Sequence, residues 1–217
     1  MKKIYLTLSL LVFVFNCEKQ HPLQKEQQRL INSEITASNV FKVVQDGEVL
    51  YENTQNSGKL GDKEINDKTI FPIWSMSKPI TTVAMMILYD QGGFNLDDNL
   101  SMYLPEFENM MCKKDSVIQP CKNQIKIIDL LTHRSGFGYY NDVYGENMFI
   151  GKPSPLYKYT NTYSYDDLNE FSLAVSKQPL EFEPGQHYFY GLNQDILGRV
   201  IEVITGKSFY EYLKDNL

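Results

Sequence analysis

A serine and a lysine stand three positions apart, at Ser75 and Lys78. Residues i and i+3 share one face of a helix, so the amine of Lys78 can reach the hydroxyl of Ser75. A serine hydroxyl becomes a good nucleophile when a base accepts its proton, and burial together with a helix N-terminus is expected to lower the pKa of Lys78 for that task. The spacing therefore indicates an activated serine. Taken alone, however, the spacing favours a simpler interpretation, a helix-capping serine followed by a solvated lysine.

The elements around this pair can be predicted from periodicity. Pro79 is tolerated only in a first helical turn, so a helix must begin near Ser75, and Gly92-Gly93 predicts its end. Its expected buried stripe consists of Ile80, Val83, Ala84, Ile87 and Leu88. Upstream, Asp46-Gly47 separates two apolar runs within residues 40–51, which predicts a β-hairpin because both central turn residues need a positive φ.

Three sequence blocks follow one another in the chain. They read FPIWSMSKPITTVAMMILYDQGGFNLDDNLSMYLPEF (71–107), IIDLLTHRSG (127–136) and PGQHYFY (184–190). Together they resemble the penicillin-recognising serine hydrolases, which include class C β-lactamases, DD-peptidases and related serine esterases. The resemblance spans residues 40–217. It implies an α/β (α+β) fold of the β-lactamase/transpeptidase type, with an N-terminal hairpin of an antiparallel sheet and a mainly helical lobe.

The resemblance also implies roles for individual residues. Ser75 is expected to be the acylated nucleophile, and Lys78 the general base or its partner. Tyr190 is expected to shuttle a proton between the nucleophile and the leaving group, because a tyrosine beside a lysine ionises more readily. His133 belongs to the second block and is expected to be structural.

The chain departs from the β-lactamase pattern after Tyr190. That pattern is Tyr-x-Asn, whereas here Asn193 comes one residue late; it is the candidate substrate-binding residue, and it can also cap the helix that follows. The stretch 190–198 is more similar to the esterase branch. The resemblance thus implies an acyl-enzyme hydrolase of an ester, a β-lactam or a D-Ala-D-Ala-type amide, with an esterase-like activity favoured. The alternative is a non-catalytic penicillin-binding-like envelope lipoprotein or an inactive truncated fragment.

The N-terminus predicts export. Residues 1–16 combine a positive start with a short apolar run, which is typical of a signal peptide. Cys17 directly after the run resembles a bacterial lipoprotein site, and residues 17–32 form a polar tether. We expect a periplasmic or cell-envelope protein that is held to the membrane by a lipid on Cys17. A plain signal peptide followed by a chance cysteine is the other interpretation.

An exported protein can form disulfides. Cys112 and Cys121 bracket a short polar loop and are expected to pair, with two free thiols as the alternative. The chain has only 3 His, and none has ligand-like spacing to a cysteine, so we expect no metal site and no cofactor.

Composition and length limit the function classes. The chain has 217 residues with 21 Lys and Arg against 27 Asp and Glu, a net charge of −6, which argues against nucleic acid as a partner. A small molecule or a peptidoglycan-like peptide is the expected substrate. Members of the family continue into strands that carry a Lys/His-Ser/Thr-Gly motif. No such motif occurs here, so we expect residues 33–217 to be the N-terminal part of a longer enzyme, inactive and poorly soluble alone.

Overall fold

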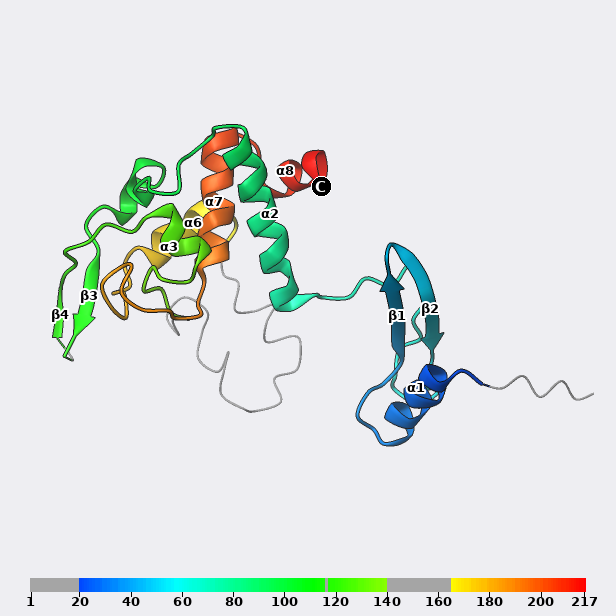
Figure 1. Cartoon of the computed structure of the whole chain (residues 1–217). Helices are drawn as coiled ribbons and strands as arrows, with labels where there is room; N and C mark the ends of the chain where they lie inside the picture. Colours follow the sequence, from blue (N-terminus) through cyan, green and yellow to red (C-terminus); the bar gives the residue numbers. More distant parts are fainter. Residues whose placement is uncertain (1–19, 116, 140–164) are drawn as a thin grey trace, which may run out of the picture. The chain divides into compact units, whose positions relative to one another are not determined.

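A computed structural model of the chain describes residues 20–115, 117–139 and 165–217 (Figure 1). The chain divides into two compact units, Met1–Pro72 and Ile73–Leu217, so a boundary falls inside the single domain expected over residues 33–217.

The predicted signal peptide at residues 1–16 and the predicted lipidation site at Cys17 lie outside the described residues. Among the residues that the structure does describe, no helix is both long enough and apolar enough to cross a membrane.

The first unit contains the predicted hairpin. Strands β1 (Asn39–Gln45) and β2 (Glu48–Gln55) pair antiparallel, in agreement with the prediction. Asp46 and Gly47 form the turn with φ values of 51° and 81°. Both are positive, as a two-residue hairpin turn of this twist requires.

Within the predicted polar tether at residues 17–32, the structure has a helix, α1 (Pro22–Asn32). Proline is well suited to a first helical position, and the side chain of His21 accepts a hydrogen bond from the Leu23 amide at 3.2 Å. The side chain of Ile31 is buried, although the polar composition of the segment did not indicate that any of it packs against the domain.

Gln27 joins α1 to the hairpin. Its side chain is fully buried, and all four of its hydrogen-bonding positions are used. Nε2 donates to Asn39 Oδ1 and to the Asn53 carbonyl, each at 3.0 Å. Oε1 accepts from the Tyr51 hydroxyl and from Asn53 Nδ2, each at 2.9 Å. A two-stranded hairpin is marginal alone, so this amide contributes to its stability.

Replacing Gln27 with Leu is expected to destabilise the first unit by about 1–3 kcal/mol, because the half-buried polar groups of Asn39, Tyr51 and Asn53 lose their hydrogen-bond partner. Hydrogen exchange of the hairpin amides in the full chain measures the effect. The matched control is Gln24→Leu on the same helix, where the side chain is only partly buried. Equal amide protection in the two variants would contradict the role of Gln27.

The second unit is mainly helical. Its elements are η1 (Trp74–Met76), α2 (Ser77–Asp90), η2 (Leu100–Met102), η3 (Pro105–Phe107), β3 (Met111–Lys114), β4 (Val117–Pro120), α3 (Ile127–Leu131), α6 (Leu168–Val175), α7 (Asn193–Thr205) and α8 (Phe209–Asn216). Strands β3 and β4 form a second antiparallel hairpin. Helix α7 packs against α2, α3, α6 and α8 and therefore forms the centre of the unit (Figure 1).

The buried face of α2 differs from the predicted stripe. Ala84 and Leu88 are buried as expected, but Ile80 and Val83 are 39% and 46% exposed, and Met85 is buried in their place. Apolar side chains surround much of this helix, so period alone could not choose its inner face. The inner face of α2 is determined by its contacts with α7 and α8. Helix α2 packs on α7, and the Tyr212 hydroxyl of α8 donates to the Ala84 carbonyl.

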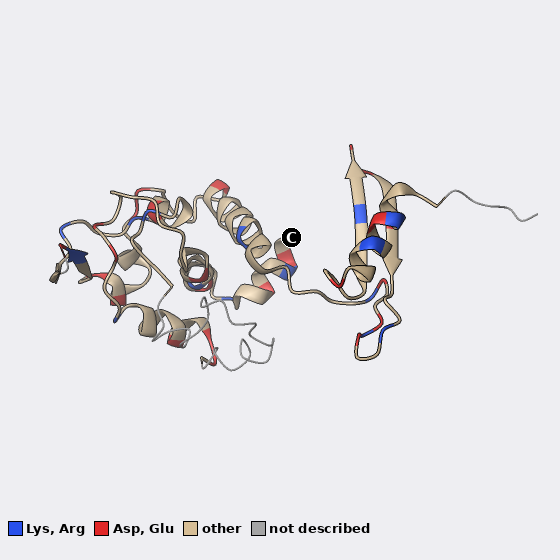
Figure 2. Cartoon of the chain, turned by 90° about the horizontal axis from the view of Figure 1, so that it is seen from below, with Lys and Arg blue, Asp and Glu red and all other residues tan. Residues whose placement is uncertain are grey.

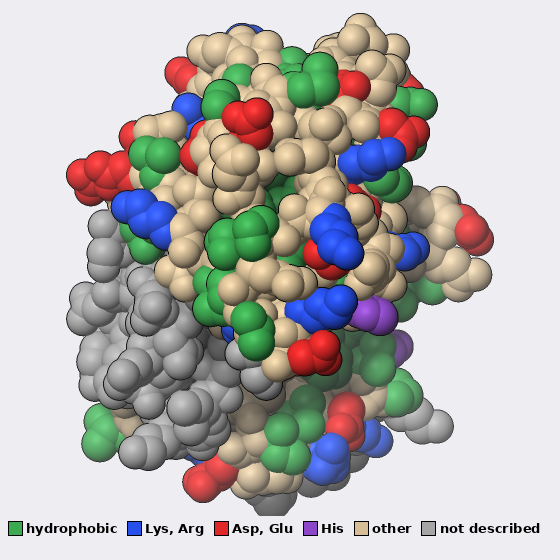
Figure 3. All heavy atoms as spheres, turned by 90° about the vertical axis from the view of Figure 1, so that its left-hand side faces the viewer, with side chains coloured by type: hydrophobic (Ala, Val, Ile, Leu, Met, Phe, Trp, Pro, Cys, Tyr) green, Lys and Arg blue, Asp and Glu red, His purple; other side chains and the backbone are tan. Residues whose placement is uncertain are grey.

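Charged residues of both signs are interspersed along the two units (Figure 2). On the face of the molecule in Figure 3, basic and acidic side chains also lie among apolar ones and gather into no single-charge patch.

Candidate active site

The nucleophile candidate lies at a strained start of α2. Ser75 is exposed within η1, and Lys78 is the second residue of α2. The residue before Ser75 is Trp74, whose φ of 51° places a bulky side chain in the left-handed region. Such a conformation is costly and occurs preferentially at functional sites. The first amides of a helix are not used by its own hydrogen bonds, so the Ser75 end of α2 can present N–H groups to an anion.

Tyr190 lies in the segment that leads into α7, and its side chain contacts Ser75. Its hydroxyl donates to Ser75 Oγ at 2.8 Å. The Nζ atom of Lys78 lies 4.8 Å from the centre of the Tyr190 ring. The structure thus brings together the three residues for which the resemblance implies catalysis, although 115 positions of sequence separate Ser75 from Tyr190.

A second tyrosine belongs to this cluster. The ring of Tyr139 lies 6.0 Å from that of Tyr190, and its side chain hydrogen-bonds to Lys78. The sequence alone did not identify Tyr139 as a catalytic or binding residue. The available signal was its position, three residues after Gly136 at the end of the second block.

The pKa shifts in this cluster favour a protonated Lys78 and a more readily ionised Tyr190. Burial acts to lower the pKa of Lys78, but hydrogen bonds with Tyr190 and Tyr139 outweigh it and raise the pKa above its ordinary value. The expectation of a lowered lysine pKa is therefore wrong. Burial acts to raise the pKa of Tyr190, but hydrogen bonds with Ser75 and Lys78, and the lysine charge, lower it. Tyr190 therefore loses its proton more readily than Lys78, and its deprotonated form is the more available base of the two.

Gly191 lets the Tyr190 segment approach its neighbour. A Cβ atom at Gly191 would overlap the carbonyl oxygen of Phe137 and lie 2.9 Å from its carbonyl carbon. The two backbones are therefore in direct contact, and only glycine fits between them. This close contact places the neighbouring Tyr190 relative to the segment that contains Phe137.

Asn193 does not lie where a substrate could reach it. Its side chain is fully buried, Oδ1 accepts from the Ser135 hydroxyl at 2.5 Å, and Nδ2 lies 2.8 Å from His133 Nδ1. This position corrects the substrate-binding role expected for it. Nor does Asn193 cap α7, because the cap residue is Leu192 and Asn193 is the first helical residue.

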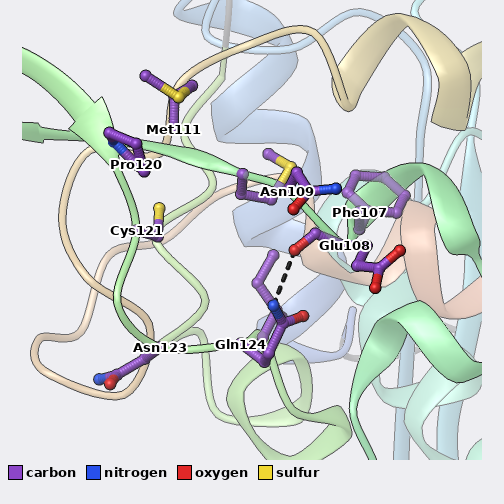
Figure 4. Close-up of a pocket in the computed structure, with 10 residues that line it drawn as sticks. Phe107, Glu108, Asn109, Met111, Pro120, Cys121, Asn123 and Gln124 are labelled. Carbon is purple, nitrogen blue, oxygen red and sulfur yellow. Dashed lines mark hydrogen bonds between the residues drawn. The ribbon is translucent and has the colours of Figure 1, made fainter.

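Cys112 and Cys121 are joined by a disulfide between β3 and the residue that follows β4. Beside it lies a cavity of about 230 Å³, lined among others by Phe107, Met111 and Gln124 (Figure 4). The Gln124 amide crosses the cavity wall to donate to the Glu108 carbonyl at 2.8 Å. None of the residues that line this cavity belongs to the cluster around Ser75.

The Glu183 carboxylate lies within 4.8 Å of both disulfide sulfurs. Sulfurs bonded to each other are not the thiolates that a metal requires. The same carboxylate accepts hydrogen bonds from the amides of Lys122 and Asn123, at 2.8 and 3.3 Å. Glu183 is therefore satisfied by the loop after the disulfide.

Comparison with known proteins decides the family. Residues 29–217 match the family described as Beta-lactamase. The chain belongs to the beta-lactamase family. This confirms the resemblance found in the sequence.

Proteins similar to this chain include an esterase and a hydrolase with acyltransferase activity. Esterase EstB of Burkholderia gladioli is 30% identical over 174 residues, which cover 76% of this chain and 40% of the esterase. The solved structure of EstCE1, a hydrolase with promiscuous acyltransferase activity, is similar with a TM-score of 0.69 and 26% identity, over 89% of this chain and 49% of that one. The structure of a D-stereospecific amidohydrolase from Streptomyces sp. shares the fold at a TM-score of 0.64 and 17% identity, over 89% and 53%.

These similarities confirm the predicted α+β fold of the beta-lactamase type. The chain spans about half the length of the solved structures and 40% of the esterase. At the level of the family, the similar proteins support a serine hydrolase.

Proposed function

We propose that the protein is a serine hydrolase that forms an acyl-enzyme on Ser75, with ester substrates favoured. The observation that carries the proposal is the hydrogen bond of 2.8 Å between the Tyr190 hydroxyl and Ser75 Oγ, with the Lys78 ammonium 4.8 Å from the Tyr190 ring. A nucleophile, a base within hydrogen-bond reach of it and a third group that tunes the base are the parts that acyl transfer requires.

The reaction proceeds in two proton-balanced steps. The Tyr190 phenolate accepts the Ser75 proton as Oγ attacks the substrate carbonyl carbon, and the carbonyl oxygen becomes an oxyanion at the amide-presenting start of α2. Tyr190 then returns the proton to the leaving alkoxide, which departs as an alcohol. Water repeats the cycle by giving a proton to Tyr190 while its oxygen attacks the acyl carbon, and Ser75 recovers its proton as the carboxylic acid leaves.

The preference for esters rests on Asn193. In the β-lactamase pattern the asparagine after the tyrosine donates to the amide side chain of the substrate. Here that amide group is buried against Ser135 and His133 and offers no such contact. An amide or lactam substrate loses an orienting partner, whereas an ester does not need one.

The experiment is adduct mapping on the full chain. Incubation with a fluorophosphonate and digestion are expected to give one modified peptide, with the adduct on Ser75, and Ser75→Ala is expected to abolish it. The matched control is Ser77→Ala, since Ser77 lies two positions on and out of register with Lys78. An adduct on another residue, or unchanged labelling of Ser75→Ala, would sink the assignment.

Substrate class is tested with the same protein. The rate at which a fluorescent penicillin labels Ser75 is compared with the rate for p-nitrophenyl acetate, and the ester is expected to react faster. Absence of any adduct on a chain shown to be folded by circular dichroism would favour the alternative, a non-catalytic envelope lipoprotein or an inactive truncated fragment.

A further inference from the structure

A buried polar network lies directly behind Tyr190. Ser135 and Asn193 are both fully buried, and the Ser135 hydroxyl donates to Asn193 Oδ1 at 2.5 Å. The same hydroxyl oxygen accepts from the Phe137 amide at 3.1 Å. Nδ2 of Asn193 lies 2.8 Å from Nδ1 of His133. The network therefore ends on a histidine ring.

The network fixes which nitrogen of His133 carries a proton. In the structure the Ser135 hydroxyl donates to Asn193 Oδ1, and its oxygen accepts from the Phe137 amide. With the amide oxygen of Asn193 on Ser135, the group that faces the histidine is the NH₂ donor. Nδ1 of His133 must then be an acceptor. The neutral ring with its proton on Nε2 is the form that can accept at Nδ1 from Asn193 Nδ2.

His133 holds the Tyr190 segment on both sides. The His133 carbonyl accepts from the Phe189 amide at 2.8 Å. The two rings of His133 and Tyr190 are stacked, with centroids 4.9 Å apart and planes 29° apart. The Gly191 amide points to His133 Nδ1 at 3.5 Å. Three consecutive residues, 189 to 191, thus each contact His133.

The backbone at His133 is a second observation. Its φ of 55° lies in the left-handed region, just after the end of α3, a position where helices commonly place glycine. Few side chains other than glycine adopt this conformation, and positions that the surrounding structure holds there are typical of functional sites.

The charged and titratable side chains around His133 fit a neutral ring. Lys78 of α2 is the cation that acts on it, and Tyr188 and Tyr190 lie against its ring. Burial, and then the charge of Lys78, lower the pKa of His133. The guanidinium of the adjacent Arg134 is directed to the Gly185 carbonyl instead.

We infer that His133 is a positioning residue, a neutral Nε2-protonated platform, oriented by Asn193 and Ser135, that holds the Tyr190 ring in register with Ser75. Its catalytic meaning rests on the proposed function. In this inference Asn193 does not bind substrate but orients the His133 ring.

The inference is tested first without any variant. Nitrogen-15 NMR of the histidine-labelled full chain at pH 7 is expected to show His133 with an unprotonated Nδ1 and a protonated Nε2. A ring protonated at Nδ1, or doubly protonated, would overturn the inference. This result does not depend on whether Ser75 reacts, so it separates failure of the inference from failure of the proposed function.

Asn193→Asp then tests the consequence. A carboxylate accepts but cannot donate, so His133 must bind a proton at Nδ1, and its pKa is expected to rise by at least one unit. The rate of fluorophosphonate reaction at Ser75 is expected to fall 10- to 100-fold at pH 7. Asn109→Asp, which adds the same charge at an exposed position, is expected to react as the wild type.

Two outcomes of this comparison are informative. If Asn193→Asp protonates His133 while Ser75 reacts at the wild-type rate, the histidine is structural only and the inference is wrong. If Asn193→Asp does not fold, the tautomer measured on the wild type still decides the matter.

Discussion

Tyr190→Phe is expected to slow the acylation of Ser75 by about 10²- to 10⁴-fold, the range that a positioned general base contributes. The variant keeps the ring that stacks on His133 and removes only the hydroxyl that lies 2.8 Å from Ser75 Oγ. Because Tyr190 is 40% exposed, loss of its hydroxyl leaves no buried group unpaired, and thermal stability is expected to be unchanged. The rate constant for fluorophosphonate labelling is the measurement.

The pH dependence of Ser75 acylation tests whether Lys78 lowers the pKa of Tyr190. In the proposed mechanism the active form of Tyr190 is the phenolate, so the acylation rate is expected to rise with pH until the Tyr190 pKa, which lies below the ordinary value for tyrosine. Lys78→Met removes a hydrogen bond and a positive charge that lower this pKa. The rising limb of the rate profile is therefore expected to move to higher pH. Lys114→Met, at an exposed position, is the control and is expected to leave the profile in place.

A rising limb that stays in place in Lys78→Met would contradict the role of Lys78 as the group that tunes Tyr190. Wild-type acylation by Tyr190→Phe would contradict the role of Tyr190 itself.

Gly191→Ala is expected to reduce acylation by about 10²-fold, the scale of loss for a misplacement near 1 Å. The new Cβ would meet the Phe137 carbonyl group and lie 3.3 Å from Gly138 Cα. These are backbone atoms, which cannot rotate away as a side chain would. The segments must separate, and the Tyr190 hydroxyl must move relative to Ser75. Overpacking of this kind is expected to cost about 1–3 kcal/mol of stability.

The control separates packing from backbone strain. Gly206 has a φ of 67° and open space around it, so Gly206→Ala introduces strain without a collision. It is expected to lower stability by about 1 kcal/mol and to leave acylation unchanged. If Gly191→Ala acylates as fast as Gly206→Ala, the close contact with Phe137 does not position Tyr190.

Local sequence predicts the turns and helix ends of this protein well. Asp46-Gly47 forms the hairpin turn, and Gly92 has the positive φ of a helix end, because these features depend on a few adjacent residues. The grouping of Ser75, Lys78 and Tyr190 came from the family resemblance. Spacing alone could place only the first two on one helix face.

What could not be predicted depends on distant partners. The pKa of Lys78 moves up because Tyr139 and Tyr190 reach it from other segments. Asn193 begins α7, and no local pattern reveals that its side chain points to Ser135 and His133, about sixty positions earlier. The helical character of α1 likewise depends on contacts of Gln27 with a hairpin that comes later in the chain.

The Cys112–Cys121 bond also acts on the molecule before it folds. It spans 9 positions of sequence and closes a small loop that persists when all other structure is lost. By restricting the unfolded chain it contributes roughly 2–3 kcal/mol of stability on the chain-entropy account. Protein synthesised in a reducing compartment lacks that restriction and starts from a broader ensemble. The same sequence therefore has two different stabilities, set by the compartment in which it was made.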